Sequence, residues 1–214
     1  MSAPRSTLIQ AMTRGAMLVA AASLLAGCIS LFPKTDPAQL YRFGTTTPPL
    51  REIASGEPSF GVLLVATGFD RAAASDRILT VTGTQAAYIK DARWVTTSVA
   101  LFDSAVQRTF DADQGPARLV DRAEIARIDY VLKLDVRTFE ARYDRGQAVA
   151  PTIVVEVHAA LNRTHDRTVA GDRSFKATVT ASENRVGAIA EAFDQAVAGV
   201  LGEVVAWVDA RGAG

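Results

Sequence analysis

The chain of 214 residues carries 23 basic and 23 acidic side chains, so its formal net charge is zero, and 49% of its residues are hydrophobic. This length fits one domain with a short appendage, and the apolar content excludes a wholly disordered chain. Zero net charge argues against nucleic-acid binding, because phosphate recognition requires a surplus of Lys and Arg. The single cysteine excludes an intrachain disulfide framework and a zinc site built from several thiolates.

The first thirty residues have the pattern of a secretory signal. Arg5 and Arg14 are the only charged residues before position 34, and residues 15–27 are almost entirely small and apolar. This run has the length of a signal-peptide core and is too short to cross a bilayer as a helix. We therefore predict that residues 1–27 are a signal peptide.

The end of this segment resembles a bacterial lipobox, formed by Leu25, Ala26, Gly27 and Cys28. The resemblance implies cleavage before Cys28, attachment of diacylglycerol to its thiol and acylation of its new amino group, with palmitate among the acyl chains. The alternatives are a signal peptide with a chance cysteine and a buried structural cysteine. The order and spacing of charged, apolar and lipobox segments favour lipidation, which would anchor the protein without a spanning helix.

Cleavage before Cys28 leaves 187 of the 214 residues, with two more acidic than basic side chains, because Arg5 and Arg14 are lost. The residue after the cysteine is Ile29. In similar lipoproteins an Asp at this position retains the protein in the inner membrane. The resemblance therefore implies a lipid-anchored protein on the periplasmic face of the outer membrane.

The mature chain is predicted to have a tether followed by a folded domain. Five of its prolines fall between positions 33 and 58, so residues 28–58 are expected to hold the lipidated cysteine, a Pro-rich tether and an entry segment. Residues 39–43 alternate in polarity and are predicted to form a first strand. The folded domain is expected over residues 59–210.

The first half of this domain mixes strands with one helix. Residues 60–65 predict a buried strand, 68–77 a loop or helical turn, 78–82 a strand and 85–89 a weaker one. A helix is predicted to begin at Thr96, Thr97 or Ser98. It carries one apolar stripe, made by Val99, Phe102, Val106 and Phe110.

The second half alternates strictly in polarity over residues 130–136, 153–161 and 175–179, with turns at 142–146 and 164–167. One wet and one buried face is typical of an antiparallel meander. Residues 186–208 hold a helical period, with Ser182 or Asn184 as the expected cap. The sequence predicts an α+β fold: a largely antiparallel or mixed sheet with two amphipathic helices on one face, in a two-layer sandwich.

Catalytic motifs are missing from the sequence, which has no nucleophile elbow, phosphate-binding loop or zinc-protease motif. The two histidines, His158 and His165, could bind a metal with Asp166 and Asp172, but solvated turn residues are the favoured interpretation. We expect no catalytic residue, metal site or cofactor, and no enzyme. Trp94 and Trp207 are interpreted first as core residues and otherwise as interface anchors.

Residues 88–94, Tyr-Ile-Lys-Asp-Ala-Arg-Trp, lead into the predicted helix over 97–110. This arrangement resembles the ABC-type transport auxiliary lipoprotein family, which includes paraquat-inducible protein C. Residues 40–43 soon after the cysteine and 134–140 after the helix fit the family's order. The chain departs from the family where a Tyr-Arg pair often precedes the Tyr-to-Trp segment, since residues 78–82 read Ile-Leu-Thr-Val-Thr.

The resemblance implies a non-catalytic lipoprotein subunit of an ABC-driven lipid transport system. Its implied partners are a mammalian-cell-entry domain protein, whose oligomer forms a tube across the periplasm, and the permease and ATPase of the same system. Self-association is left open. Tyr88 and Trp94 are hypothesised to form part of the docking surface. The alternatives are an envelope scaffold lipoprotein that activates a cell-wall synthase or assembles outer-membrane machinery, and a tethered hydrolase.

Overall fold

The structure is a computed structural model of the whole chain, and it describes residues 37–46, 59–123 and 128–212. The chain divides into two compact units, Met1–Pro37 and Ala38–Gly214, and the fold described below belongs to the second. The lipobox residues, Cys28 among them, and Ile29 lie outside the described residues. None of the helices in the described ranges is both long enough and apolar enough to span a bilayer.

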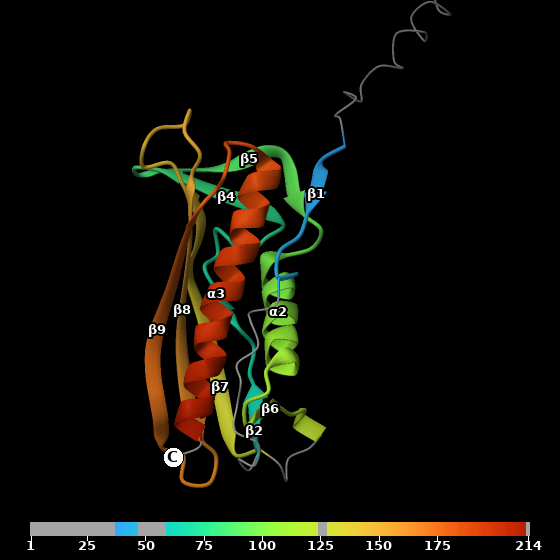
Figure 1. Cartoon of the computed structure of the whole chain (residues 1–214), viewed down its shortest axis with the longest axis vertical. Coiled ribbons are helices and arrows are strands. Elements are labelled where there is room, and N and C mark those ends of the chain that lie inside the picture. The colour runs from blue at the N-terminus through green and yellow to red at the C-terminus, as the bar shows by residue number, and fades with distance from the viewer. Residues whose placement is uncertain (1–36, 47–58, 124–127, 213–214) are drawn as a thin grey trace, which may run out of the picture. The chain divides into compact units, whose positions relative to one another are not determined.

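Three long strands form an antiparallel meander: β7 (Tyr130–Arg142), β8 (Thr152–Arg163) and β9 (Val169–Thr180). Their side chains alternate between a buried and a solvated face, as the sequence predicted. Leu132, Leu134 and Val136 of β7 are completely buried. Figure 1 shows these strands as the tall part of the sheet, with β9 at its outer edge.

The opposite edge of β7 is covered by short strands that follow one another along it. These are β2 (Phe60–Leu64), β3 (Gly68–Phe69) and β4 (Arg77–Thr82), all parallel to β7. β6 (Ala117–Leu119) extends β2 in parallel, β5 (Gln85–Trp94) forms an antiparallel hairpin with β4, and β1 (Gln39–Tyr41) lies parallel to β5. The described sheet is therefore a mixed sheet of nine strands.

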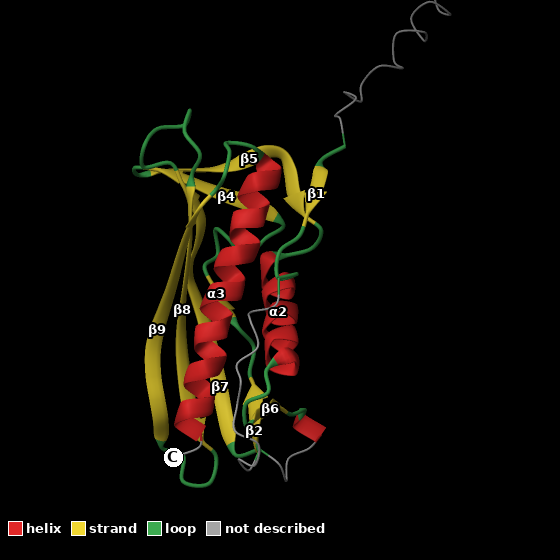
Figure 2. Cartoon of the chain, in the orientation of Figure 1, coloured by secondary structure: helices red, strands yellow, loops and turns green. Residues whose placement is uncertain are grey.

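Both helices lie on one face of this sheet, as Figure 2 shows: α2 (Ser98–Ala112) and α3 (Val186–Gly212). The Thr97 hydroxyl accepts a hydrogen bond from the Ala100 amide at 3.3 Å, so α2 has a cap within the predicted group of residues. α3 packs on β8, β9 and α2. The predicted α+β sandwich of two layers, with a mixed sheet and two helices on one face, is confirmed.

Two of the predicted strands, at residues 85–89 and 130–136, differ from the sequence-based expectation. β5 continues to Trp94, well beyond the weak strand expected at 85–89, because β1 and β4 pair with it on both sides. β7 contains a bulge between Val136 and Thr138, which turns Phe139 toward the helices where strict alternation would have turned Thr138. Both differences depend on pairing with distant segments, which a local polarity pattern does not record.

An aromatic cluster fills the core where β5, β7 and α3 meet. Phe139 lies between Phe43 and Phe193, with ring centroids 5.0 and 4.7 Å away. Trp94 contacts Phe43 edge-on at 4.9 Å and Phe193 at 5.3 Å. The four rings are almost completely buried. Such ring pairs add about 0.5–1.5 kcal/mol each beyond the burial of their apolar area.

Candidate functional site

The entry strap is the name used here for residues 38–46, which precede the sheet and are included in the second compact unit. The sequence had grouped these residues with the tether and entry segment 28–58. Residues 39–41 form β1 and pair with residues 92–94 of β5, as the predicted first strand requires. The Val95 amide donates to the Tyr41 carbonyl at 2.8 Å, which continues this contact beyond β5.

Beyond β1 the strap is held by packing and by one cation. Phe43 is 1% exposed and inserts its ring into the aromatic cluster. Gly44 has a φ of +75°, and a Cβ at this position would lie 2.6 Å from the Cβ of Ala105. Arg108 of α2 donates from Nε and Nη2 to the Gly44 carbonyl at 3.0 and 2.6 Å. The backbone at position 44 therefore requires glycine for both its conformation and its close approach to α2.

A second attachment joins the strap to α3. The Asp194 carboxylate accepts hydrogen bonds from the amide and hydroxyl of Thr45 at 2.7 and 2.8 Å, and from those of Thr46 at 3.1 and 2.7 Å. Burial alone would raise the pKa of Asp194, but the bonds from Thr46 and Thr45 outweigh it and lower this pKa below its ordinary value. The ionised carboxylate is thus the form that holds the strap.

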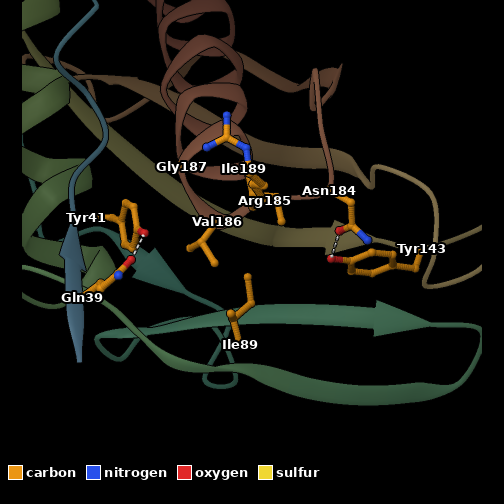
Figure 3. Close-up of a pocket in the computed structure, with 9 residues that line it drawn as sticks. All are labelled: Gln39, Tyr41, Ile89, Tyr143, Asn184, Arg185, Val186, Gly187 and Ile189. Atoms are coloured by element: carbon orange, nitrogen blue, oxygen red, sulfur yellow. Dashed lines mark hydrogen bonds between the residues drawn. The ribbon is translucent and has the colours of Figure 1, made fainter. Parts of the chain in front are cut away.

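A pocket of about 480 Å³ lies beside the strap, between β1, β5, the turn after β7 and the start of α3 (Figure 3). We call it the entry pocket. It is lined by Gln39, Tyr41, Ile89, Tyr143, Asn184, Arg185, Val186, Gly187 and Ile189. Its floor is aliphatic and its rim is polar, a composition that suits binding.

The polar groups of the rim are already bonded to one another. The Tyr41 hydroxyl donates to Gln39 Oε1 at 2.6 Å, and the Tyr143 hydroxyl donates to Asn184 Oδ1 at 3.0 Å, as Figure 3 shows. The Asn184 side-chain nitrogen donates to the Gln147 carbonyl at 2.7 Å, so this side chain also holds the loop between β7 and β8. Hydrogen bonds within the protein therefore hold these rim side chains in place.

Two ionisable groups at or next to the rim, Tyr143 and Glu183, have shifted pKa values. Burial raises the pKa of Tyr143, so its hydroxyl stays neutral and donates at physiological pH. The Arg185 guanidinium lies 2.6 Å from Glu183, and this hydrogen bond and the opposite charge lower the pKa of Glu183. The pocket lining contains no serine, cysteine, histidine or carboxylate, and therefore none of the usual nucleophile–base pairs.

The structure separates the two residues hypothesised to form a docking surface. Trp94 is 2% exposed and belongs to the aromatic cluster, so its side chain cannot contact a partner, and the core interpretation is correct. Tyr88 is half-buried: its hydroxyl donates to the Ala72 carbonyl at 3.0 Å, and the Arg77 guanidinium lies 3.8 Å from its ring centroid. A docking role for Tyr88 and the residues around it stays a prediction.

His158 lies in β8 and His165 in the turn between β8 and β9. His158 Nε2 is 2.8 Å from Asp172 Oδ1 across β8 and β9, and His165 Nε2 is 3.2 Å from Asp166 Oδ2 in the turn between these strands. Within the described ranges no three His, Cys, Asp or Glu side chains gather as a group that could hold a metal ion. Each histidine therefore has one carboxylate partner.

The comparisons with known proteins agree with the architecture. The family model described as "ABC-type transport auxiliary lipoprotein component" matches residues 45–205. The chain belongs to this family. The resemblance drawn from residues 88–94 and the following helix is thereby confirmed. As an auxiliary lipoprotein of a transport system, a member of this family is expected at a membrane of the cell envelope.

Solved structures show the same fold. Protein XCC0632 from Xanthomonas campestris, described as a DUF330 protein, is 27% identical, with a TM-score of 0.70 over 81% of this chain and 96% of that chain. The hypothetical protein CT253 from Chlamydia trachomatis is 12% identical, with a TM-score of 0.51 over 72% of this chain and 98% of that chain. Among curated proteins none matches this sequence significantly.

Sequence reasoning did not find the contacts of the strap. Asp194 lies 149 residues from Thr45, and Arg108 lies 64 residues from Gly44. In the sequence, Asp194 is one polar position on an apolar helix and Gly44 one glycine among many. The only local signal was the alternation of residues 39–43, which located the strand but not what it is fastened to.

Proposed function

We propose that this protein is a non-catalytic, outer-membrane lipoprotein of an ABC-driven mammalian-cell-entry system that carries lipid across the periplasm. The observation that carries the proposal is the family match over residues 45–205 in a chain whose sequence places a lipobox at 25–28. Its role in this proposal is to hold the outer end of the periplasmic tube. Its partners are the tube-forming mammalian-cell-entry protein and, through it, the permease and ATPase.

The fastening of the entry strap supports an anchoring role. Gln39, the first residue of β1, lies eleven positions after Cys28, and a fully extended chain covers at most about 3.6 Å per residue. The lipid anchor would therefore keep β1 within about 40 Å of the bilayer surface. Because Phe43, Arg108 and Asp194 fix the strap to the core and both helices, the folded domain would be held at that distance.

Residue 29 gives a direct test of the membrane assignment. Ile29→Asp should move the protein from the outer-membrane to the inner-membrane fraction, whereas Ile29→Ser, the matched control, should leave it in place. Cys28→Ser should abolish labelling with an acyl-chain probe and release the protein from membranes. An inner-membrane location of the unchanged protein, or acyl labelling that survives Cys28→Ser, would refute the anchoring part of the proposal.

Crosslinking tests the partner. A photo-crosslinking residue placed at Lys90, whose side chain is 91% exposed near Tyr88, should capture the mammalian-cell-entry protein. The same residue at Thr178, on the exposed face of β9, serves as the control. Position 90 is the better probe because Trp94 is buried. Capture of a cell-wall synthase or its regulators at Lys90, with no mammalian-cell-entry protein, would favour the scaffold alternative and reject lipid transport.

A further inference from the structure

The free edge of β9 differs from the other parts of the described sheet. β9 runs for 12 residues and pairs only with β8, so one row of its backbone amides and carbonyls has no strand partner in the described ranges. Its register with β8 is regular from Gly171 to Thr180. β9 contains no proline, one of the devices that protect exposed edges from pairing. An edge of this length can accept a further strand.

A groove of about 700 Å³ runs along this edge, between β9 and the C-terminal half of α3. Its base is aromatic: Phe175 and Trp207 pack edge-on with ring centroids 5.7 Å apart. Gly171 makes this packing possible, because a Cβ there would lie 2.7 Å from Cζ2 of Trp207. Ala206 and Ala210 lie four residues apart on α3, about one turn of helix, and their small side chains leave the groove open on this side.

Two cations flank the aromatic base. The Arg173 guanidinium lies 4.9 Å from the Phe175 ring centroid, and Arg211 lines the groove from the last turn of α3. Within the described ranges neither arginine forms an ion pair with a carboxylate, although Glu203 lines the same groove. Other arginines on this sheet do: Arg142 lies 2.6 Å from Glu140, and Arg137 lies 3.5 Å from Asp135.

We propose that the β9 edge and this groove bind an extended acidic segment of a partner protein, which adds to the sheet as a further strand. Backbone hydrogen bonds to β9 would supply affinity, since main-chain pairing is the basis of strand addition. Side chains alternate across an added strand, so every second one would point into the groove. An apolar side chain would pack on the few exposed atoms of Trp207, which is 7% exposed, and carboxylates two residues away on either side would pair with Arg173 and Arg211.

This inference goes beyond the proposed function, because it concerns a different surface from the one near Tyr88 and names the chemistry of its occupant. Charge decides between occupants. Two arginines without an ion-pair partner among the described residues, beside an apolar base, favour carboxylates on an extended chain. A second copy of this protein would bring two arginines and one glutamate to a symmetric contact, so like charge would prevail there.

The chain provides its own reporter for a test, because it has two tryptophans: Trp207 at the groove and Trp94 in the core. The full mature chain, labelled with 5-fluorotryptophan, should give two ¹⁹F resonances, which Trp207→Phe assigns. The probe is a ten-residue peptide with a central phenylalanine, a glutamate two residues before it and another two residues after it, and threonine at the remaining positions, so that phenylalanine and both glutamates share one face of the added strand. Adding it should shift the Trp207 resonance and leave that of Trp94 unchanged.

Matched controls separate strand addition from other kinds of binding. Arg173→Glu with Arg211→Glu should weaken peptide binding about tenfold or more. Arg71→Glu with Lys133→Glu, the same change of charge at two exposed positions that do not line the groove, should not. A peptide with lysine in place of glutamate should not bind. Nor should the acidic peptide after N-methylation of alternate amides, because it cannot pair with β9.

Several outcomes would overturn the inference. One is an unmoved Trp207 resonance at millimolar acidic peptide; another is equal binding of the lysine or N-methylated peptides. A shift that depends on protein concentration alone would make the groove a contact between copies of this chain. A shift produced by phosphatidylglycerol vesicles but not by the peptide would make it a lipid-facing surface. Lys90 crosslinking is independent of these results, so the two proposals fail separately.

Discussion

The two ends of α3 lie in different chemical environments. Near its start, the polar groups of the entry pocket and the entry strap are bonded to one another: Tyr143 to Asn184, and Thr45 and Thr46 to Asp194. Near its end, Arg173 and Arg211 flank an aromatic groove without an ion-pair partner in the described part of the chain. The polar groups near the start of α3 therefore have partners within the protein, whereas the two arginines near its end have no ion-pair partner among the described residues.

This difference indicates what each region does. Buried or half-buried polar groups that are fully bonded stabilise one conformation, and removing one partner leaves the other unsatisfied. Solvated cations without partners contribute little to folding but remain available for binding. Substitutions at the strap should therefore affect the free energy of unfolding, and substitutions at the groove should affect binding alone.

The largest effect is expected at Phe43. Phe43→Ala removes a ring that contacts Trp94 and Phe139, leaves a cavity in the aromatic cluster and should lower the free energy of unfolding by about 3–5 kcal/mol. Urea unfolding followed by circular dichroism measures this loss. Leu40→Ala, three residues away and 63% exposed, is the control and should change stability by less than about 0.5 kcal/mol. Equal losses for the two variants would contradict a strap held by its core residue.

A smaller loss is expected from Gly44→Ala. The new Cβ would meet Ala105 at 2.6 Å at a φ of +75°, which should cost about 1–3 kcal/mol of stability. Gly83→Ala is the matched control: its φ is +57°, but a Cβ there meets nothing within 4 Å. The difference between the two losses, from thermal unfolding, measures the crowding against α2. If Gly83→Ala lowers stability as much as Gly44→Ala, backbone conformation alone explains the requirement for glycine at position 44.

Asp194→Asn should lower stability at neutral pH by about 1 kcal/mol, because a neutral amide replaces a partly exposed carboxylate that accepts bonds from Thr45 and Thr46. The folded-state pKa of Asp194 is lowered, so its contribution is fully present above its ordinary pKa of 3.8 and is lost as the pH falls through the folded value. The difference in Tm between the unchanged protein and the variant should therefore shrink below pH 4.

The control for this pH dependence is Glu203→Gln, a change at an exposed carboxylate elsewhere on α3. Its Tm difference from the unchanged protein should be small at every pH. A Tm difference for Asp194→Asn that persists unchanged at low pH would mean that the carboxylate charge does not hold the strap.

The smallest effect is expected at the groove. Arg211→Ala should change the free energy of unfolding by less than about 0.5 kcal/mol, because Arg211 lies exposed in the last turn of α3 and forms no ion pair in the described ranges. Chemical unfolding measures the free energy of unfolding of this variant and of Arg108→Ala, which removes two hydrogen bonds to the Gly44 carbonyl and serves as the comparison. A larger loss for Arg211→Ala than for Arg108→Ala would contradict the assignment of the groove to binding.

Much of the fold could be predicted from local patterns. The alternation over 130–136, 153–161 and 175–179 located β7, β8 and β9, because each strand has one wet and one buried face. The cap at Thr97 and the helical period from residue 186 located α2 and α3. The short strands β3 and β6 were not predicted, because two or three residues are too few to show a period and their pairing with β7 and β2 is with distant segments.

The candidate sites could be predicted only in part. Tyr88 and Trp94 were chosen because their spacing resembles a family pattern, yet one is half-buried and the other belongs to the core. The order of residues along a strand does not reveal which face a tryptophan adopts at the strand's end. The groove was missed because Arg173 and Phe175 in β9 meet Trp207 and Arg211 only after α3 folds back over the sheet.

The sequence by itself indicated the family and the two-layer α+β architecture, and it predicts a signal peptide and a lipobox ending at Cys28, since each depends on residues close together in the chain. Only the tertiary structure decided how the entry strap is fastened and where an open edge and a cationic groove remain. Those features depend on residue pairs far apart in sequence, such as Thr45 with Asp194. Packing of the whole domain determines which polar groups find partners and which are left for another molecule.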